Sequence, residues 1–157
     1  MLENDIKKLI IENIYSNTDV RIEINDQTYS YEPKGQALEV GLMNFLVDNN
    51  EDVPTTFLNR NSQTPMMLQI PFDQYLKRKV VLRQVQGKPE IVRVYVKGAP
   101  ELVMPLCNQT LDFNGNRKEF EDSDQGNILN HIVSNDMADQ GLKVLSFAFK
   151  DMEVDEV

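Results

Sequence analysis

Ile91-Val92-Arg93-Val94-Tyr95-Val96, followed at once by Lys97-Gly98-Ala99-Pro100-Glu101, is the stretch that says most about the fold. Its first part is rich in β-branched residues and predicts a strand. Glycine lets a ligand or another backbone approach closely, and proline followed by an acidic residue suits the first turn of a helix. The stretch therefore predicts a strand, a tight turn and a helix start, with Lys97 and free backbone N–H groups at the rim of a sheet. Such a layout suits an anionic ligand, although junctions of this kind are common.

The composition indicates one globular domain over residues 1–157, with 41% hydrophobic residues and no apolar run of 18 or more. The acidic N-terminal residues do not resemble a signal peptide. The chain has a single cysteine, Cys107, and a single histidine, His131. These numbers exclude an internal disulfide framework and leave little for a metal site or a Ser-His-Asp triad. We expect a reducing, cytosolic environment, and His131 on a helix surface without a role.

The formal net charge of −9 argues against general nucleic-acid binding, which requires a broad basic surface. A polyphosphate ligand would need a local basic cluster, and Lys77-Arg78-Lys79, with Arg83 following, provides one. The alternative interpretation is a solvated strand edge, since lysines protect sheet edges. The pattern alone does not decide between the two.

The hydrophobic pattern predicts alternating helices and strands along the chain. Helices are expected near 4–16, 36–47 and 100–106, and from Ser123 or Asp124 to Gly141. Strands are expected over 20–24, 66–72, 80–85, 91–96, 110–113 and 142–149. A break is expected at 32–35, a polar surface loop with room for a short helical turn over 48–64, and a tight turn at Asn114-Gly115. Adjacent strands interspersed with helices indicate an α+β fold with a largely antiparallel, twisted sheet of about six strands flanked by helices.

Sequence motifs for catalysis are scarce. The chain contains neither a GxxxxGK[ST] loop nor a GxGxxG fingerprint, and a paired-carboxylate site cannot be singled out among its acidic residues. Lysines near strand ends, an adjacent aromatic residue and a glycine turn favour binding instead. We therefore predict no catalytic residue and no metal ligand.

Four segments, in order, resemble the nucleotide-binding (N) domain of the P-type cation-transporting ATPases, especially the calcium-transporting branch. The resemblance covers roughly residues 5–152. The segments are Gly35-Gln36-Ala37-Leu38-Glu39-Val40-Gly41-Leu42, Pro71-Phe72-Asp73-Gln74-Tyr75-Leu76-Lys77-Arg78-Lys79, Val96-Lys97-Gly98-Ala99-Pro100-Glu101 and Met137-Ala138-Asp139-Gln140-Gly141-Leu142-Lys143-Val144-Leu145. Four departures concern the ligand site: Leu38 replaces a threonine of the family pattern, Gln74 a serine, Lys79 a methionine and Lys143 an arginine.

The resemblance implies a role for three residues at the adenine. Phe72 would stack on the base, Glu39 would accept a hydrogen bond from the exocyclic amine, and Gly98 would let the base approach the backbone. Without the resemblance, the ordinary interpretations are a core phenylalanine, a solvated glutamate and a turn glycine.

The resemblance assigns four more residues to the nucleotide. Lys77 and Lys97 would border the purine and reach toward the phosphates, Lys143 would contact a phosphate oxygen, and Gln74 would add a polar contact. The ordinary interpretation of the lysines is a surface position with the stem lying along apolar neighbours.

The implied function is to hold ATP, as Mg-ATP in the intact pump, for transfer of the γ-phosphate to an aspartate in a separate domain. That aspartate belongs to a DKTGT motif, which this chain lacks. The chain would be inactive alone and monomeric. It would be a cytoplasmic domain of an integral membrane protein, without direct membrane contact, whose partners are the phosphorylation and actuator domains.

Two other functions remain open. The first is a non-catalytic regulatory or interaction domain of the same fold that has lost nucleotide binding, which the Leu38 and Lys143 departures support. The second is a free-standing small hydrolase, which the lack of a recognisable nucleophile–base pair disfavours.

Overall fold

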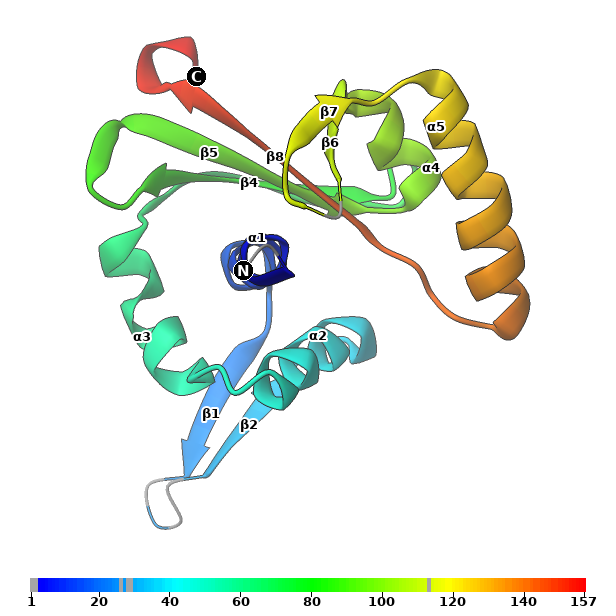
Figure 1. Cartoon of the computed structure of the whole chain (residues 1–157). Helices are drawn as coiled ribbons and strands as arrows, with labels where there is room; N and C mark the ends of the chain where they lie inside the picture. Colours follow the sequence, from blue (N-terminus) through cyan, green and yellow to red (C-terminus); the bar gives the residue numbers. More distant parts are fainter. Residues whose placement is uncertain (1–2, 26, 28–29, 113) are drawn as a thin grey trace.

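The main sheet is antiparallel, with the strand order β3-β4-β5-β8 (Figure 1). The computed structural model describes residues 3–25, 27, 30–112 and 114–157. Within them, two further hairpins, β1–β2 and β6–β7, stand apart from the main sheet. The elements are α1 (Glu3–Ser16), β1 (Arg21–Asn25), β2 (Ser30–Lys34), α2 (Ala37–Asp48), α3 (Val53–Gln63), β3 (Met66–Asp73), β4 (Arg78–Val85), β5 (Lys88–Gly98), α4 (Pro100–Val103), η1 (Met104–Leu106), β6 (Gln109–Leu111), β7 (Arg117–Glu119), α5 (Asp122–Asn127), η2 (Ile128–Met137), η3 (Ala138–Gln140), β8 (Ser146–Glu153) and η4 (Val154–Glu156).

The β4–β5 hairpin is the centre of the sheet, and its register determines which side chains share a face. Gly87 takes a positive φ of 75° in the connecting turn, a conformation that glycine adopts without steric cost. Lys79 lies opposite Lys97, and Val81 lies opposite Tyr95. Because side chains alternate along a strand, these four residues point to the same face.

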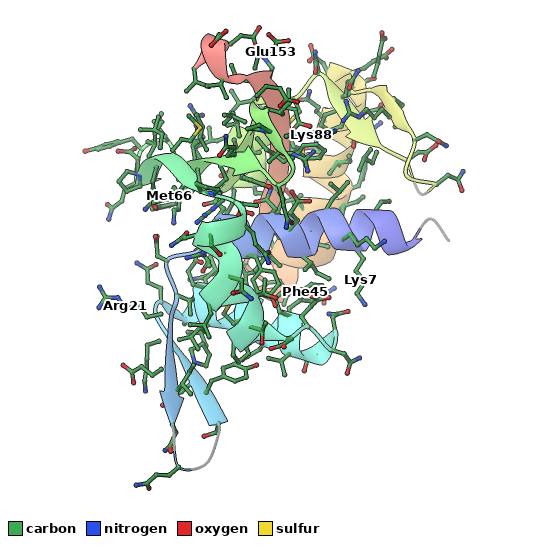
Figure 2. The ribbon with its side chains drawn as sticks, turned by 90° about the vertical axis from the view of Figure 1, so that its left-hand side faces the viewer. Lys7, Arg21, Phe45, Met66, Lys88 and Glu153 are labelled. Carbon is green, nitrogen blue, oxygen red and sulfur yellow. The ribbon has the colours of Figure 1, made fainter. Side chains whose placement is uncertain are left out.

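Helix α1 lies between the sheet and the layer formed by α2 and α3, and the β1–β2 hairpin projects from that layer (Figures 1 and 2). Hydrophobic residues are buried on β4 and β5, among them Val81, Leu82 and Val92, and another cluster of the hydrophobic core lies on the α2–α3 side of α1. Its buried members are Ile14, Tyr15, Val20, Met43, Leu46 and Val53. This burial orders the helices, since removing apolar surface from water contributes roughly 25 cal/mol per Å².

By contrast, the contact between the C-terminal half of α1 and the sheet is largely polar. Arg83 of β4 is buried and donates to the carbonyl oxygen of Ser16, the last residue of α1, at 2.9 Å. It also donates to the carbonyl oxygen of Thr64 at 2.8 Å. Burial, aided by the nearby charge of Arg60, lowers the pKa of Arg83 to about 10. These bonds satisfy carbonyl groups that a helix end leaves without partners.

The opposite side of the sheet carries α4, with α5 and η2 beyond it (Figure 1). The predicted helix from residue 123 is present, but Ile128–Met137 is wound as a π-helix. Gly141 ends this helical region in the left-handed conformation, as the sequence predicts. His131 is exposed on η2, which confirms the prediction of a helix-surface position.

Three expected elements differ from the structure. The predicted loop 48–64 contains α3, whose N-cap Asp52 accepts from the backbone N–H of Thr55 at 3.2 Å, so the loop prediction is wrong. The predicted break at 32–35 overlaps β2, where Pro33 is tolerated because the hairpin has no third strand. The last strand begins at Ser146 rather than at 142, since the left-handed turn at Gly141 is followed by irregular chain.

The expected sheet of about six strands is divided, because β1–β2 and β6–β7 each pair only locally. Every pairing is antiparallel, which confirms that part of the prediction. The predicted strand 110–113 begins at Gln109, and its last residue, Phe113, lies outside the described residues.

The basic cluster is not a solvated strand edge. Lys77 is exposed, but Lys79 and Arg83 are buried on β4, an inner strand of the sheet. The solvated interpretation is therefore wrong for both, because each charge is held by polar groups at the end of α1 and just beyond it.

Candidate functional site

Glu39 and Lys97, predicted from separate segments, are in direct contact. Lys97, near the end of β5, forms an ion pair and a hydrogen bond with Oε1 of Glu39 in the first turn of α2. The other oxygen of Glu39 accepts from the hydroxyl of Thr18 at 2.8 Å. The two side chains are only 6% and 14% exposed, so the pair lies largely out of water.

Burial lowers the pKa of Lys97, and the positive charge of Lys79 lowers it further, while the hydrogen bond that Lys97 donates to Glu39 opposes both effects. Burial is the largest cause, since a desolvated ammonium loses its hydration. The contact with Glu39 therefore stabilises the charged form of Lys97.

A second ion pair lies beside the first. Nζ of Lys79 is 2.6 Å from Oδ1 of Asp19, which also accepts from the side-chain amide of Gln69 at 3.2 Å. Partial burial acts to raise the pKa of Asp19, but its contacts with Lys79 and Gln69 outweigh that effect and lower it. Together, Asp19, Glu39, Lys79 and Lys97 form a cluster of two acidic and two basic side chains, called here the charge cluster.

The turn after Lys97 is fixed to the start of β4. The backbone N–H of Ala99 donates to the carbonyl oxygen of Lys77 at 3.0 Å. A Cβ on Gly98 would lie 2.4 Å from that same oxygen, so only glycine fits there. A base was expected to approach the backbone at Gly98, but on the side where a Cβ would lie, the backbone of Lys77 already fills the space. The expectation of free backbone N–H groups at the turn is wrong at Ala99.

Phe72 lies on β3, an edge strand, and is 58% exposed. The alternative interpretation of Phe72 as a core residue is therefore wrong. A bulge between Ile70 and Asp73 interrupts the regular pairing at this position. Phe72 thus presents a free aromatic surface next to the turn that leads into β4.

The turn between β3 and β4 carries two further predicted residues, Gln74 and Lys77, both exposed. Asp73 shapes the turn by accepting from the backbone N–H groups of Tyr75 and Leu76 at 2.8 and 2.7 Å. Lys77 takes a left-handed φ of 44° and lies 3.8 Å from the carboxylate of Glu101 on α4. Between exposed side chains, such a pair contributes little to stability.

Lys143 is exposed in the irregular segment before β8. The structure thus brings Glu39 and Lys97 together and packs Gly98 against the backbone of Lys77. Phe72, Gln74 and Lys143 lie at the surface and are not members of the charge cluster.

Sequence reasoning missed Thr18 and Asp19, and it considered Lys79 only as part of a basic cluster for a polyphosphate or as a solvated strand edge. The available signal was Asn17-Thr18-Asp19, a polar run directly after an apolar helix. Asn17 is fully buried and donates to the carbonyl oxygens of Lys79 and Tyr95 at 3.3 and 3.2 Å, which fixes this run beneath the sheet.

Two hollows on the surface lie elsewhere. One follows the β1–β2 hairpin and the other lies beside β6 and β7, and neither is lined by a residue of the charge cluster or by Phe72. Within the described part of the chain, no group of three or more His, Cys, Asp or Glu side chains could hold a metal ion. None of the helices seen there is long and apolar enough to cross a lipid bilayer.

Comparison with known proteins gives a family match over residues 5–157, to the model described as "P-type ATPase, cytoplasmic domain N". Among curated proteins, the chain is 26% identical over 152 residues to calcium-transporting ATPase 10, plasma membrane-type, of Oryza sativa subsp. japonica. It is 28% identical over 153 residues to calcium-transporting ATPase 8, plasma membrane-type, of Arabidopsis thaliana. Each alignment covers 97% of this chain, and 14% and 13% of the respective relative.

An animal protein is similar over a shorter range. Plasma membrane calcium-transporting ATPase 1 of Mus musculus is 27% identical over 122 residues, which are 78% of this chain and 10% of that protein. The chain therefore spans about a tenth to a seventh of the length of these relatives.

Proposed function

The chain belongs to the family described as P-type ATPase, cytoplasmic domain N, and from this membership we propose that it binds ATP at Glu39, Phe72 and Lys97. The proposed role in the parent protein is to hold the nucleotide while its γ-phosphate passes to an aspartate of a separate domain. The names of the relatives support calcium as the ion that the parent transports. Family membership also agrees with the predicted cytoplasmic location.

The observation that carries the proposal is the contact between Glu39 and Lys97. The two residues come from different segments, and the resemblance assigns both to the same end of the nucleotide. A buried carboxylate and ammonium supply an acceptor and a donor for a polar ligand. The exposed ring of Phe72 supplies a stacking surface, and base–aromatic stacking contributes about 1–3 kcal/mol in nucleic-acid systems.

Binding requires the contact to rearrange, because Lys97 is nearly buried. In the proposed bound state, Glu39 accepts from the adenine amine, and Lys97 turns toward the nucleotide together with Lys77. Gln74 and Lys143, both exposed, would reach the polar parts of the nucleotide. The domain would contribute orientation only, as in catalysis by positioning.

The magnesium ion of Mg-ATP would arrive with the phosphates, where it neutralises negative charge. We assign it no ligand in this chain, since the described residues contain no suitable cluster. One stacking surface and a few polar contacts must offset the entropy of association. We therefore expect a dissociation constant on the order of 0.1–10 mM.

Saturation-transfer NMR on the H2 and H8 protons of ATP tests the proposal. We expect transfer with the wild-type chain and its loss in Phe72→Ala, with little change in stability because Phe72 is exposed. Leu58→Ala is the matched control, since Leu58 is a large exposed residue on α3 outside the proposed site. If Phe72→Ala unfolds the protein, the assignment of Phe72 is wrong.

The second candidate function is an interaction domain that has lost nucleotide binding. It is favoured by the mutual satisfaction of Glu39, Thr18 and Lys97, which closes this part of the site. An absence of saturation transfer at millimolar ATP would support this function and contradict the first.

A further inference from the structure

The β1–β2 hairpin leaves one edge of β1 open. It is a two-stranded sheet, so within the part of the chain that the structure describes β1 pairs with β2 alone. The strand β1, which begins at the labelled Arg21, lies on the outer side of the hairpin, whereas β2 lies toward α2 (Figure 2). An edge strand presents backbone N–H and C=O groups that can pair with a strand of another chain.

The charges of the hairpin are placed unfavourably within one copy. Antiparallel pairing sets Arg21 opposite Lys34 and Glu23 opposite Glu32, with all four side chains exposed on one face. Like charges directly opposite each other destabilise a strand pair. On β2, Lys34 and Glu32 form an ion pair at 2.7 Å. Among the described residues, Arg21 and Glu23 have no such partner, so β1 carries the two charges that the hairpin leaves unpaired.

The segment Arg21-Ile22-Glu23 is complementary to itself when two copies of β1 run antiparallel. With Ile22 opposite the partner's Ile22, Arg21 of each copy lies opposite Glu23 of the other, and opposite charges in such positions attract. A shift of one residue would set the isoleucine against a charge. A shift of two residues would set arginine against arginine or glutamate against glutamate. The charges therefore specify one register.

The other face of β1 is apolar. It carries Ile22, which packs against the hydrophobic core, and Ile24, which is 46% exposed. In the register centred on Ile22, Ile24 lies diagonal to the partner's Ile22, and diagonal neighbours on a sheet are within reach of long side chains. The pairing thus covers exposed apolar surface on one face and neutralises charge on the other.

We propose that the outer edge of β1 is a docking surface for a second copy of this chain, with the two β1 strands antiparallel and centred on Ile22. The contact is twofold symmetric, since each copy uses the same surface. It replaces the expectation of a monomer and does not depend on ATP binding. Two strands of five residues bury less than the roughly 800 Å² per partner of a stable interface, and the net charge of −9 on each copy opposes association. The dissociation constant is therefore expected on the order of 0.1–1 mM.

Charge reversal on the edge tests the proposal. Arg21→Glu makes both charges of β1 acidic and Glu23→Arg makes both basic, so each variant alone should associate roughly tenfold more weakly than the wild type. An equimolar mixture of the two variants should recover the wild-type association, because each acidic side chain then faces a basic one. Both variants should fold, since each change sets opposite charges across the hairpin, against Lys34 or Glu32.

Sedimentation equilibrium over concentrations that span the expected dissociation constant measures the association, and NMR dilution of the ¹⁵N-labelled chain locates it. Lys150→Glu and Glu119→Arg are the matched controls, because they change the net charge by the same amounts at exposed positions outside the hairpin. Each control should associate as the wild type does.

Concentration-dependent shifts at the amides of β1 in the wild type and in the mixture, but in neither single variant, would support the proposal. A wild-type chain that stays monomeric at ten times the expected dissociation constant overturns it. Single variants that associate as strongly as the wild type, a mixture that does not associate, or shifts confined to another edge such as β3 also overturn it. None of these results affects the proposed binding of ATP, which a separate titration decides.

Discussion

Lys97 on β5 donates a hydrogen bond to Glu39 on α2, 58 residues earlier in the chain. The contact joins a strand of the main sheet to helix α2 and largely removes both charges from water. It connects the turn after Lys97 with the segment around Glu39, and these are two of the four segments that carry the family resemblance. The stability of the domain and its proposed function therefore involve the same pair.

The first prediction concerns the energy of this pair. Lys97→Met should lower the free energy of unfolding by about 3–5 kcal/mol, because it leaves the carboxylate of Glu39 buried without a counter-charge. The double variant with Glu39→Met should lose much less than the sum of the two single changes. Chemical denaturation of the four proteins measures this coupling.

The exposed pair of Lys34 and Glu32 is the matched control, with a distance of 2.7 Å but side chains 46% and 69% exposed. Lys34→Met should lower the free energy of unfolding far less than Lys97→Met does, because water screens an exposed ion pair. An equally small loss of unfolding free energy in Lys97→Met would show that the buried pair contributes no more to stability than the exposed pair.

The second prediction concerns Gly98. A methyl group there would lie 2.4 Å from the carbonyl oxygen of Lys77 and 2.8 Å from Cα of Arg78. Gly98→Ala should therefore displace the start of β4 and destabilise the protein by about 1–3 kcal/mol or more. Thermal unfolding measures the effect.

Gly126→Ala serves as the control for that change, since a Cβ at Gly126 in α5 meets no atom within 4 Å. It should leave stability unchanged or raise it by up to about 1 kcal/mol, because alanine favours a helix. A melting temperature for Gly98→Ala at or above that of Gly126→Ala would contradict the account of the turn.

The fold was largely predictable where the hydrophobic pattern is regular. The strands around Val80 and Val94 were found because β-branched residues dominate both. In place of helix α3 the sequence predicted a loop with a short helical turn at most, because this stretch is polar and contains Pro54. Its start signals, Asp52 as N-cap and Pro54 in the first turn, were present, but its stability comes from tertiary packing, such as Phe57 against Tyr15 at 5.6 Å between ring centroids.

The site was predictable only in part, and for a physical reason. The resemblance indicated Glu39 and Lys97, but no sequence pattern shows that their side chains meet. Lys79 belongs to a run of three basic residues that ordinarily indicates a solvated surface. It is buried because the alternation of side chains along β4 directs it toward Asp19, beneath the sheet. This contact depends on where α1 ends in the folded protein, which the local sequence around Lys79 does not encode.

The third prediction concerns acid sensitivity. Arg93 forms two hydrogen bonds with Asp151, at 2.6 and 2.8 Å, and these lower the pKa of Asp151 despite partial burial. The unfolded chain therefore binds a proton at higher pH than the native protein does. The stabilisation is present above the ordinary aspartate pKa of about 3.9 and is lost as the pH falls through the lower native value.

Asp151→Asn should consequently flatten the decrease in unfolding free energy below about pH 4. Urea denaturation between pH 2 and pH 6 measures this slope. Asp136→Asn, at an exposed position on η2, is the control for the loss of one carboxylate. Identical slopes in Asp151→Asn and the wild type would refute the assignment.

The most direct test of the central claim is a titration of the ¹⁵N-labelled wild-type chain with ATP, observed through its backbone amides. We predict saturable shifts, with a midpoint on the order of 0.1–10 mM, centred on Glu39, Phe72, Lys97 and Gly98. The amides of the β1–β2 hairpin should remain unchanged. Saturable shifts confined to other parts of the molecule, or none at millimolar ATP, would contradict the assignment of this site to the nucleotide.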